Sequence, residues 1–356
     1  MIRWPADPIP RFWAILAGDS TAVERRGRTL PPEIVDIRQF DATDFAPLLA
    51  AEACAWAERL RWDYSPSARL ISSCLAEKRL SGYALLEGRR IAGYSFFVYE
   101  GEKGLVGDLF VEGDGARREQ ALVLLECTLE TLEATPGIKR IEAQLPHFGA
   151  EDLESCFRAH NFGVYLRRFM VLPLAGRRGN QLLPNGLEAP GALGADFTVE
   201  PWERKHDRAI AQMLYSTYRH HVDATINDQY ASLEGTTRLI ENIVQLRGCG
   251  EHIPRASLVA FHRANRRLAA VVALTAVRPG TGHIPQVAVG AEFQARGLGS
   301  ALMEMAFREA ERQGYREVSL TVTDLNRGAV RLYERLGFDT LRTFGAFVWN
   351  RGRAPA

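Results

Sequence analysis

One stretch of sequence decides the fold: Ile284-Pro-Gln-Val-Ala-Val-Gly-Ala-Glu-Phe-Gln-Ala-Arg-Gly-Leu-Gly-Ser300. Its apolar beginning predicts a strand that ends at Val289, and its last residues predict a helix that begins near Gly299. Gly297 and Gly299 allow backbone N–H groups to approach a ligand closely. The start of a helix adds unpaired N–H groups and the positive end of the helix dipole. Together these features predict a cradle for a diphosphate.

Two other phosphate-binding motifs fit this stretch poorly. A Walker loop needs a lysine before Ser300, where this chain has Gly299. A dinucleotide-binding fold places its glycines after the first strand of a βαβ unit, whereas these follow the fourth predicted strand of the C-terminal half. A plain turn and packing role for Gly297 and Gly299 stays open as the alternative to the cradle.

A second informative segment is Asn326-Arg-Gly-Ala-Val-Arg-Leu-Tyr-Glu-Arg-Leu-Gly-Phe338, which predicts a helix directly after a strand. Asn326 is suited to cap the start of this helix, and Gly337 is suited to end it. Tyr333 lies one turn after Ala329 on the same helix face. The phenol of Tyr333 would have a proton to deliver near the cradle, and the alternative is an aromatic residue of the core.

These two segments, in this order and one strand apart, resemble the GNAT superfamily of acyl-CoA-dependent N-acyltransferases over Phe197 to Trp349. The segment Gln294 to Gly299 matches the family's pyrophosphate loop, Gln/Arg-x-x-Gly-x-Gly/Ala. The resemblance implies that acetyl-CoA or another acyl-CoA donates a short acyl group to an amine by direct attack. It also implies a set of residues that contact the CoA: Val287, Ala288, Val289, Gln294, Ala295, Arg296, Gly297, Leu298, Gly299, Ser300 and Asn326.

The resemblance implies that Tyr333 is the general acid that protonates the departing thiolate. The general base stays open, because the family often has a carboxylate on the fourth strand and this chain has His283 and Gln286 there. His283 is therefore a candidate base, with an ordinary strand-edge histidine as the alternative. Gln286, Asp324 and Tyr230 are candidate substrate residues.

No metal site is expected from the sequence. The five cysteines (Cys54, Cys74, Cys127, Cys156 and Cys249) are widely spread and contain no C-x-x-C pair. The segment His220-His221-Val-Asp223 is interpreted as a polar loop on the substrate side, because adjacent histidines on a helix point in different directions. The cysteine pattern also lacks a disulfide framework, which favours a cytoplasmic protein.

The two halves of the chain repeat one order of predicted elements, β-α-α-β-β-β-α-β-α-β. The sequence therefore predicts an α/β (mixed α+β) fold of two tandem GNAT-like domains, each a mixed, mostly antiparallel central sheet flanked by helices. The expected boundaries are an extension at 1–32, a degenerate GNAT-like domain at 33–174, a linker at 175–195 and a catalytic GNAT domain at 196–356. Turn-forming glycines and prolines crowd the linker.

The first domain is expected to lack the acyl-CoA site. Aligning Phe162 with Phe338 places Phe157 where Tyr333 stands, and phenylalanine has no proton to donate. The loop that corresponds to the cradle contains Glu112, Asp114 and Glu119, whose carboxylates would repel a diphosphate. We expect this domain to stabilise the catalytic half, shape the acceptor cleft or mediate dimerisation.

Composition narrows the classes of function. The chain has 356 residues and a net charge of +1, which argues against a protein that mainly binds nucleic acid or anionic lipid. The sequence contains no apolar run of the roughly 20 residues that span a membrane. Forty of the 44 basic residues are arginines, a bias typical of a GC-rich bacterial genome.

The leading hypothesis is an enzyme that acetylates a small-molecule or peptide amine. A non-catalytic acyl-CoA-binding or regulatory module is the alternative, and an inert two-domain scaffold is a third. A homodimer stays open.

Overall fold

The computed structural model describes residues 33–113, 117–175, 196–245 and 249–352. The expected extension at 1–32 and residues 176–195 of the expected linker lie outside the described part. The chain divides into two compact units. Unit 1 comprises Met1–Trp56, Tyr64–Val164 and Gly345–Ala356, and unit 2 comprises Ala57–Asp63 and Tyr165–Phe344.

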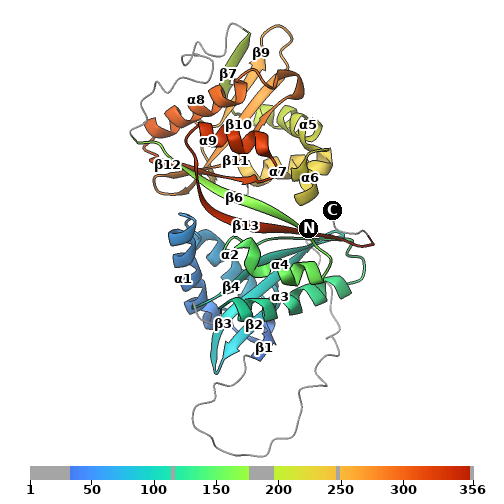
Figure 1. Cartoon of the computed structure of the whole chain (residues 1–356). Coiled ribbons are helices and arrows are strands. Elements are labelled where there is room, and N and C mark those ends of the chain that lie inside the picture. Colours follow the sequence, from blue (N-terminus) through green and yellow to red (C-terminus); the bar gives the residue numbers. More distant parts are fainter. Residues whose placement is uncertain (1–32, 114–116, 176–195, 246–248, 353–356) are drawn as a thin grey trace, which may run out of the picture. The chain divides into compact units, whose positions relative to one another are not determined.

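Unit 1 contains a six-stranded sheet in the order β1-β2-β3-β4-β5-β13 (Figure 1). Neighbouring strands are antiparallel except for the parallel pair β4 and β5. The elements are β1 (Glu33–Asp36), α1 (Ala42–Arg59), α2 (Ser65–Ala76), β2 (Ser81–Glu87), β3 (Arg90–Glu100), β4 (Lys103–Val111), α3 (Arg117–Ala134), β5 (Arg140–Gln144), α4 (Ala150–Ala159) and the end of β13 (Asp339–Asn350).

Helices cover both faces of this sheet because its strands are apolar on both sides. Leu124, Leu125 and Leu129 of α3 pack with Leu109 of β4 and with α4 on one face. On the other face, α1 and α2 pack against residues such as Phe110. Alternating side chains of a strand point to opposite faces, so Leu109 and Phe110 enter different cores.

Unit 2 contains strands in the order β6-β12-β11-β10-β9-β7, and the short β8 pairs with β10. Only β11 and β12 are parallel among these pairs. The elements are β6 (Gly163–Pro173), β7 (Phe197–Pro201), α5 (Asp207–Tyr218), α6 (Val222–Ile226), α7 (Leu233–Val244), β8 (Glu251–His252), β9 (Leu258–His262), β10 (Leu268–Arg278), β11 (Thr281–Val289), α8 (Leu298–Arg312), β12 (Glu317–Thr323) and α9 (Arg327–Arg335).

The sheet of unit 2 is also covered on both faces (Figure 1). Helices α8 and α9 pack on the side that holds Ala270, Val272 and Leu274 of β10. Helices α5 and α7 pack on the side that holds Val271 and Ala273. This alternation explains why β10 is apolar at almost every position.

Each unit includes a strand from the other half of the sequence. In unit 2, Arg167–Pro173 of β6 pairs antiparallel with Glu317–Thr323 of β12. In unit 1, Ala346–Asn350 of β13 pairs antiparallel with Arg140–Gln144 of β5. Phe347 then stacks on Phe157 with ring centroids 3.7 Å apart. The compact units therefore do not coincide with the predicted domains 33–174 and 196–356. Those domain boundaries stay predictions, drawn from the repeated order of elements in the sequence.

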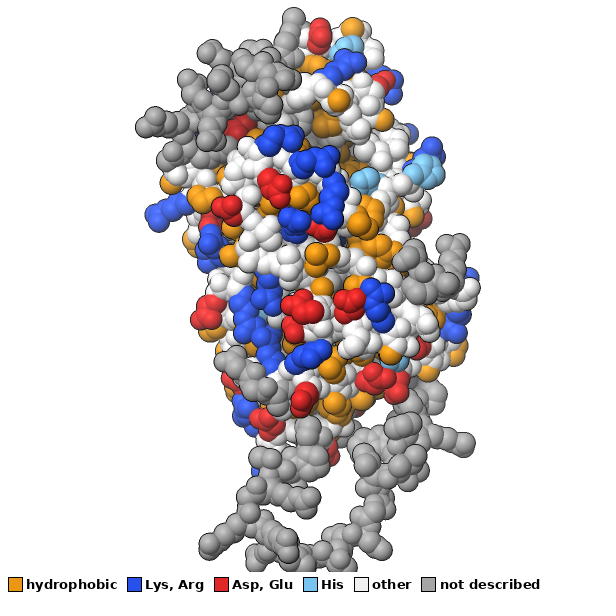
Figure 2. Space-filling view, in the orientation of Figure 1, with side chains coloured by type: hydrophobic (Ala, Val, Ile, Leu, Met, Phe, Trp, Pro, Cys, Tyr) orange, Lys and Arg blue, Asp and Glu red, His pale blue; other side chains and the backbone are white. Residues whose placement is uncertain are grey.

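The predicted fold class is confirmed, since both sheets are mixed, mostly antiparallel and flanked by helices. The main local difference is the segment 222–231, which forms α6 and a 3-10 turn where the sequence favoured a loop. Among the described helices, none is long and apolar enough to cross a lipid bilayer. Figure 2 shows acidic and basic side chains on one face of the molecule, in agreement with the near-neutral charge.

Candidate active site

The segment between β11 and α8 forms a tight turn in unit 2. A 3-10 turn at Ala291–Phe293 leads to Ala295 (φ +60°) and Gly297 (φ +75°), and Gly297 is the N-cap residue of α8. The N–H of Ala301 donates to the carbonyl oxygen of Gly297 at 3.0 Å. The N–H groups of residues 298–300 precede it and have no acceptor within the helix. These are the N–H groups that the sequence predicts to form a cradle for a diphosphate.

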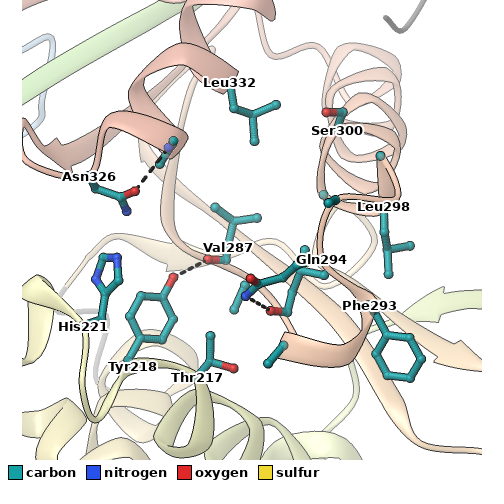
Figure 3. Close-up of a pocket in the computed structure, with 18 of the residues that line it drawn as sticks. Thr217, Tyr218, His221, Val287, Phe293, Gln294, Leu298, Ser300, Asn326 and Leu332 are labelled. Atoms are coloured by element: carbon teal, nitrogen blue, oxygen red, sulfur yellow. Dashed lines mark hydrogen bonds between the residues drawn. The ribbon is translucent and has the colours of Figure 1, made fainter. Parts of the chain in front are cut away.

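This turn is anchored at its ends and open in the middle. The side chains of Phe293 and Leu298 are buried in the core of unit 2. Gln294 donates from Nε2 to the carbonyl oxygen of Val289 at 3.1 Å, which closes the turn (Figure 3). Gln294, Ala295 and Arg296 are exposed to solvent. An anion can therefore reach the N–H groups at the start of α8 without displacing core side chains.

A cavity of about 810 Å³ lies along this turn, within the size range of small-molecule sites. Its walls come from the end of α5, the end of β11, the turn, the first residues of α8, and α9 (Figure 3). Ten of the eleven predicted CoA residues line it: Val287, Ala288, Val289, Gln294, Ala295, Gly297, Leu298, Gly299, Ser300 and Asn326. Arg296 does not line it, and its guanidinium lies 6.0 Å from the centroid of the Phe293 ring.

The end of β11 has one paired edge and one edge without strand pairing. Val287–Val289 pairs with Ala270–Val272 of β10. On the opposite side, the pairing with β12 runs from Thr281 to Ile284 and stops there. The two parallel strands therefore separate toward the cavity. The carbonyl oxygens of Val287 and Val289 accept hydrogen bonds from Tyr218 and Gln294, so the N–H groups on this edge are the ones available to a ligand.

Helix α9 brings Tyr333 to the cavity. The Asn326 side chain caps the helix by accepting a hydrogen bond from the N–H of Ala329 at 3.2 Å (Figure 3). Tyr333 is 7% exposed and its ring meets that of Phe338 at a centroid distance of 5.8 Å. Burial, with a contribution from the Asp223 charge, raises the pKa of the phenol above its ordinary value. Within the described residues, the hydroxyl has no hydrogen-bond partner.

Tyr218 and His221 form the opposite wall of the cavity. Tyr218 donates its hydroxyl proton to the carbonyl oxygen of Val287 at 2.9 Å (Figure 3). The ring of Tyr218 meets that of His221 edge-on at 5.4 Å and stacks on Tyr230 at 4.7 Å. Tyr218 therefore holds both the end of β11 and the imidazole in place.

His221 lies beside a buried carboxylate. Its Nδ1 is 3.2 Å from Oδ2 of Asp223, and the imidazole is about one-third exposed (33%). Asp223 also accepts a hydrogen bond from the hydroxyl of Thr323 at 2.5 Å. Burial alone would raise the pKa of Asp223, but the His221 and Thr323 hydrogen bonds and the charge of Arg167 hold it below its ordinary value. The carboxylate is thus ionised at neutral pH and orients the imidazole.

The predicted substrate residues lie close to this wall but do not line the cavity. Tyr230 donates its hydroxyl proton to Oε1 of Gln286 at 2.7 Å. Asp324 is paired with the guanidinium of Arg168 at 2.5 Å and with that of Arg327 at 2.9 Å. These charges are already compensated, so Asp324 acts as a structural partner of the helix start.

His283 lies away from the cavity, in the part of β11 that pairs with β12. Its imidazole faces Trp62 and Phe169, at centroid distances of 5.1 and 6.2 Å. Its Nδ1 is 2.9 Å from the hydroxyl oxygen of Ser319. Burial lowers the pKa of His283 to about 3, so the imidazole is neutral at physiological pH.

The sequence reasoning missed Thr217 and Tyr218 as cavity residues and gave His221 no role of its own. Tyr218 is the last residue of α5 and His221 caps the start of α6, so no single helix face links them. Their place opposite Tyr333 follows from the packing of α5 on the sheet, which no local pattern contains.

Comparisons with known proteins agree with this geometry. Residues 215–338 match the model of the acetyltransferase (GNAT) family. A mycothiol acetyltransferase of Mycobacteroides abscessus is 34% identical over 95 residues, which is 27% of this chain and 29% of that protein. A [ribosomal protein bS18]-alanine N-acetyltransferase of Escherichia coli is 37% identical over 70 residues, which is 20% of this chain and 47% of that protein. The matches thus span less than half of the length of these curated relatives.

One solved structure extends the likeness to the whole fold. A tandem GNAT protein from the clavulanic acid biosynthesis pathway aligns with a TM-score of 0.57 and 16% identity. The alignment covers 90% of this chain and 99% of that one. At this identity the likeness concerns the fold, and it includes the tandem arrangement of two GNAT-like halves.

Proposed function

We propose that this chain, whose residues 215–338 match the acetyltransferase (GNAT) family, transfers a short acyl group, acetyl in the simplest case, from acyl-CoA to an amine. The acceptor is a small molecule or a peptide. One observation carries the proposal: the exposed N–H groups at the start of α8 open into the same cavity as the unpartnered hydroxyl of Tyr333. A diphosphate held at one end leaves a thioester within reach of a proton donor at the other.

The turn is suited to the diphosphate of CoA by its backbone rather than by its side chains. The N–H groups of residues 298–300 and the dipole of the fifteen-residue helix α8 favour an anion there. Gly297 and Gly299 keep side chains out of this space. Arg296 is exposed next to the turn and adds a positive charge that can follow the phosphates.

We assign Tyr333 as the general acid. Attack of a neutral amine on the thioester carbonyl forms the C–N bond and breaks the C–S bond, and the leaving thiolate takes a proton. The raised pKa of Tyr333 keeps the phenol protonated throughout the neutral range, so the proton is present when it is needed. The backbone N–H groups of the unpaired β11 edge are available to stabilise the oxygen anion that develops during attack.

We assign the general base to His221 rather than to His283. His221 lines the cavity, where its Nδ1 accepts a hydrogen bond from the N–H of Asp223 and lies 3.2 Å from the ionised carboxylate of the same residue. The negative charge beside the ring favours uptake of a proton from the amine. His283 is enclosed by Trp62 and Phe169 and does not reach the cavity.

Thiol release from acetyl-CoA with a panel of amines tests the overall proposal. The panel contains small amines, aminoglycosides and peptides with free N-termini, and we expect turnover with at least one of them. A non-catalytic acyl-CoA-binding module would bind acetyl-CoA in calorimetry and release no thiol with any acceptor. A scaffold would show no thermal shift with CoA.

Substitution of each candidate histidine tests the base. His221→Gln should lower kcat/KM by roughly 100-fold, because the amine loses its proton acceptor. His220→Gln is the matched control, because His220 is the preceding residue and is exposed outside the cavity. If His283→Gln lowers kcat/KM and His221→Gln does not, the assignment is wrong.

A further inference from the structure

Helices α3 and α4 of unit 1 bring together a group of side chains that the acyl-transfer site does not use (Figure 1). These side chains are Glu126 and Glu133 of α3, Cys156 of α4, and His160, which ends α4. We propose that Glu126, Cys156 and His160 form a binding site for a divalent transition metal of the zinc class, with Glu133 as a positioning residue.

The three ligand atoms are already clustered. The Sγ of Cys156 lies 3.4 Å from Oε2 of Glu126, and Nε2 of His160 lies 2.9 Å from Oε1 of the same carboxylate. All three groups offer a ligand atom within 4.8 Å of one another. A tetrahedral zinc ion with bonds of about 2.0–2.3 Å needs ligand atoms about 3.3–3.7 Å apart, so small side-chain rotations complete the geometry. Water fills the fourth position.

Glu133 gives the histidine its orientation. Its Oε1 lies 3.0 Å from Nδ1 of His160, while Nε2 of the same ring points to Glu126. A carboxylate on one ring nitrogen and a metal on the other is the arrangement that fixes the tautomer of metal-binding histidines. The imidazole is held on both sides, with 11% of its side chain exposed.

The charges of the cluster also favour a cation. Within the described part of the chain, no Lys or Arg side chain pairs with the carboxylate of Glu126 or of Glu133. A bound dication would offset the charge of the two carboxylates, and the Cys156 thiol would give its proton to the solvent on binding.

The ligand types select the metal. A thiolate with an imidazole and one carboxylate is typical of zinc and cobalt, whereas magnesium and calcium prefer oxygen ligands alone. Cys156 and His160 are one helical turn apart, and Glu126 enters from a second helix that shares the core of unit 1. A metal there would clamp α4 to α3.

Cobalt titration of the full-length protein under reducing conditions tests the site. We expect one Co²⁺ per chain, with tetrahedral d–d absorption and a thiolate-to-cobalt charge-transfer band, and we expect Zn²⁺ to displace it. Cys156→Ser should abolish the charge-transfer band. Cys127→Ser is the matched control and should keep the charge-transfer band. Cys127 follows Glu126 on α3 but lies outside the cluster.

Two further variants separate ligands from the positioning residue. His160→Ala should weaken Co²⁺ binding more than Glu133→Gln, which should retain the charge-transfer band and bind roughly 10–100-fold more weakly. Circular dichroism of each variant, recorded without metal, checks that it is folded. Absence of a charge-transfer band in the wild type, or an equal band in folded Cys156→Ser, would overturn the proposal. These readouts are independent of acyl transfer.

Discussion

The two halves of the sequence follow similar orders of elements but differ at the positions where chemistry would occur. Three residues before its end, β11 of unit 2 has Gln286 and β4 of unit 1 has Asp108. Helix α9 of unit 2 has Tyr333 facing a cavity, and α4 of unit 1 has Phe157 with no exposed surface. The same fold thus forms a core whether this position holds a tyrosine that faces a cavity or a phenylalanine that is fully buried.

In unit 1, Asp108 belongs to a buried polar cluster. Tyr64 donates its hydroxyl proton to Asp108 at 2.6 Å, and Tyr94 donates to Glu52 at 2.7 Å. Burial and the neighbouring Asp108 raise the pKa of Glu52 well above its ordinary value. Both tyrosine hydroxyls of this cluster are paired with carboxylates, whereas the phenol of Tyr333 in unit 2 has no hydrogen-bond partner within the described residues.

Gly297→Glu should have the largest effect on the difference between the units. It would give the turn of unit 2 a carboxylate, like the acidic loop expected for unit 1. The substitution introduces a side chain at φ +75° and a negative charge where the diphosphate would lie. We expect loss of about 3 kcal/mol or more of CoA binding, roughly 100-fold, in calorimetry. Gly280→Glu is the control, because Gly280 has φ +78°, an open surrounding and no place in the cavity. Equal losses in both variants would contradict the cradle.

Tyr333→Phe gives unit 2 the residue type that unit 1 has at Phe157. We expect kcat to fall by roughly 100-fold, because the leaving thiolate loses its proton donor. CoA affinity should stay nearly unchanged, since the hydroxyl makes no hydrogen bond within the described residues. Steady-state kinetics and calorimetry measure the two quantities. A parallel loss in both would assign Tyr333 to packing instead of catalysis.

Phe157→Tyr is the reciprocal substitution in unit 1. The added hydroxyl would be buried between Phe347 and Phe162, where ring stacking leaves no acceptor. An unpaired buried hydroxyl costs about 1–3 kcal/mol, so the free energy of unfolding should fall by that amount in denaturant titration. Acyl transfer at 25 °C should be unaffected. A gain in activity would mean that unit 1 retains chemistry.

Glu52→Gln tests the buried polar cluster of unit 1 through the pH dependence of the protein's stability. A carboxyl whose pKa is raised in the folded state stabilises the fold below its unfolded pKa, and this stabilisation is lost as pH rises through the folded value. Glutamine mimics the protonated form at every pH. The variant should therefore gain stability over the wild type as pH rises above about 4.5, by at most about 1.4 kcal/mol per pH unit. Thermal melts at pH 5 and pH 8 measure this. A constant difference would exclude a buried proton on Glu52.

Local sequence patterns sufficed for the elements around the cradle. The strand that ends at Val289 and the helix that begins next to Gly299 follow from apolar periodicity and glycine placement, and both agree with β11 and α8. The residue types at the two ends of α9 also predicted its limits, with Asn326 as the cap at its start and Gly337 (φ +90°) at its end.

Contacts between segments that are distant in the sequence could not be predicted from local patterns. The apolar run of β6 predicts a strand but does not specify β12 as its partner, because backbone pairing is the same for any strand of suitable length. The carboxylate beside His221 depends on the short α6, and the Cys156–His160 spacing gains meaning only when α3 supplies Glu126. In each case one partner comes from another element.

The positions of β6 and β13 restrict how this protein can be divided. A fragment that stops in the segment 176–195 would contain β6 without β12 and would leave β5 with a bare edge, and the complementary fragment would carry β13 without its partner. Neither piece is self-sufficient, so single-half expression should yield insoluble material. Two pieces produced together can still exchange these strands, which makes the segment 176–195 a natural position for a split reporter.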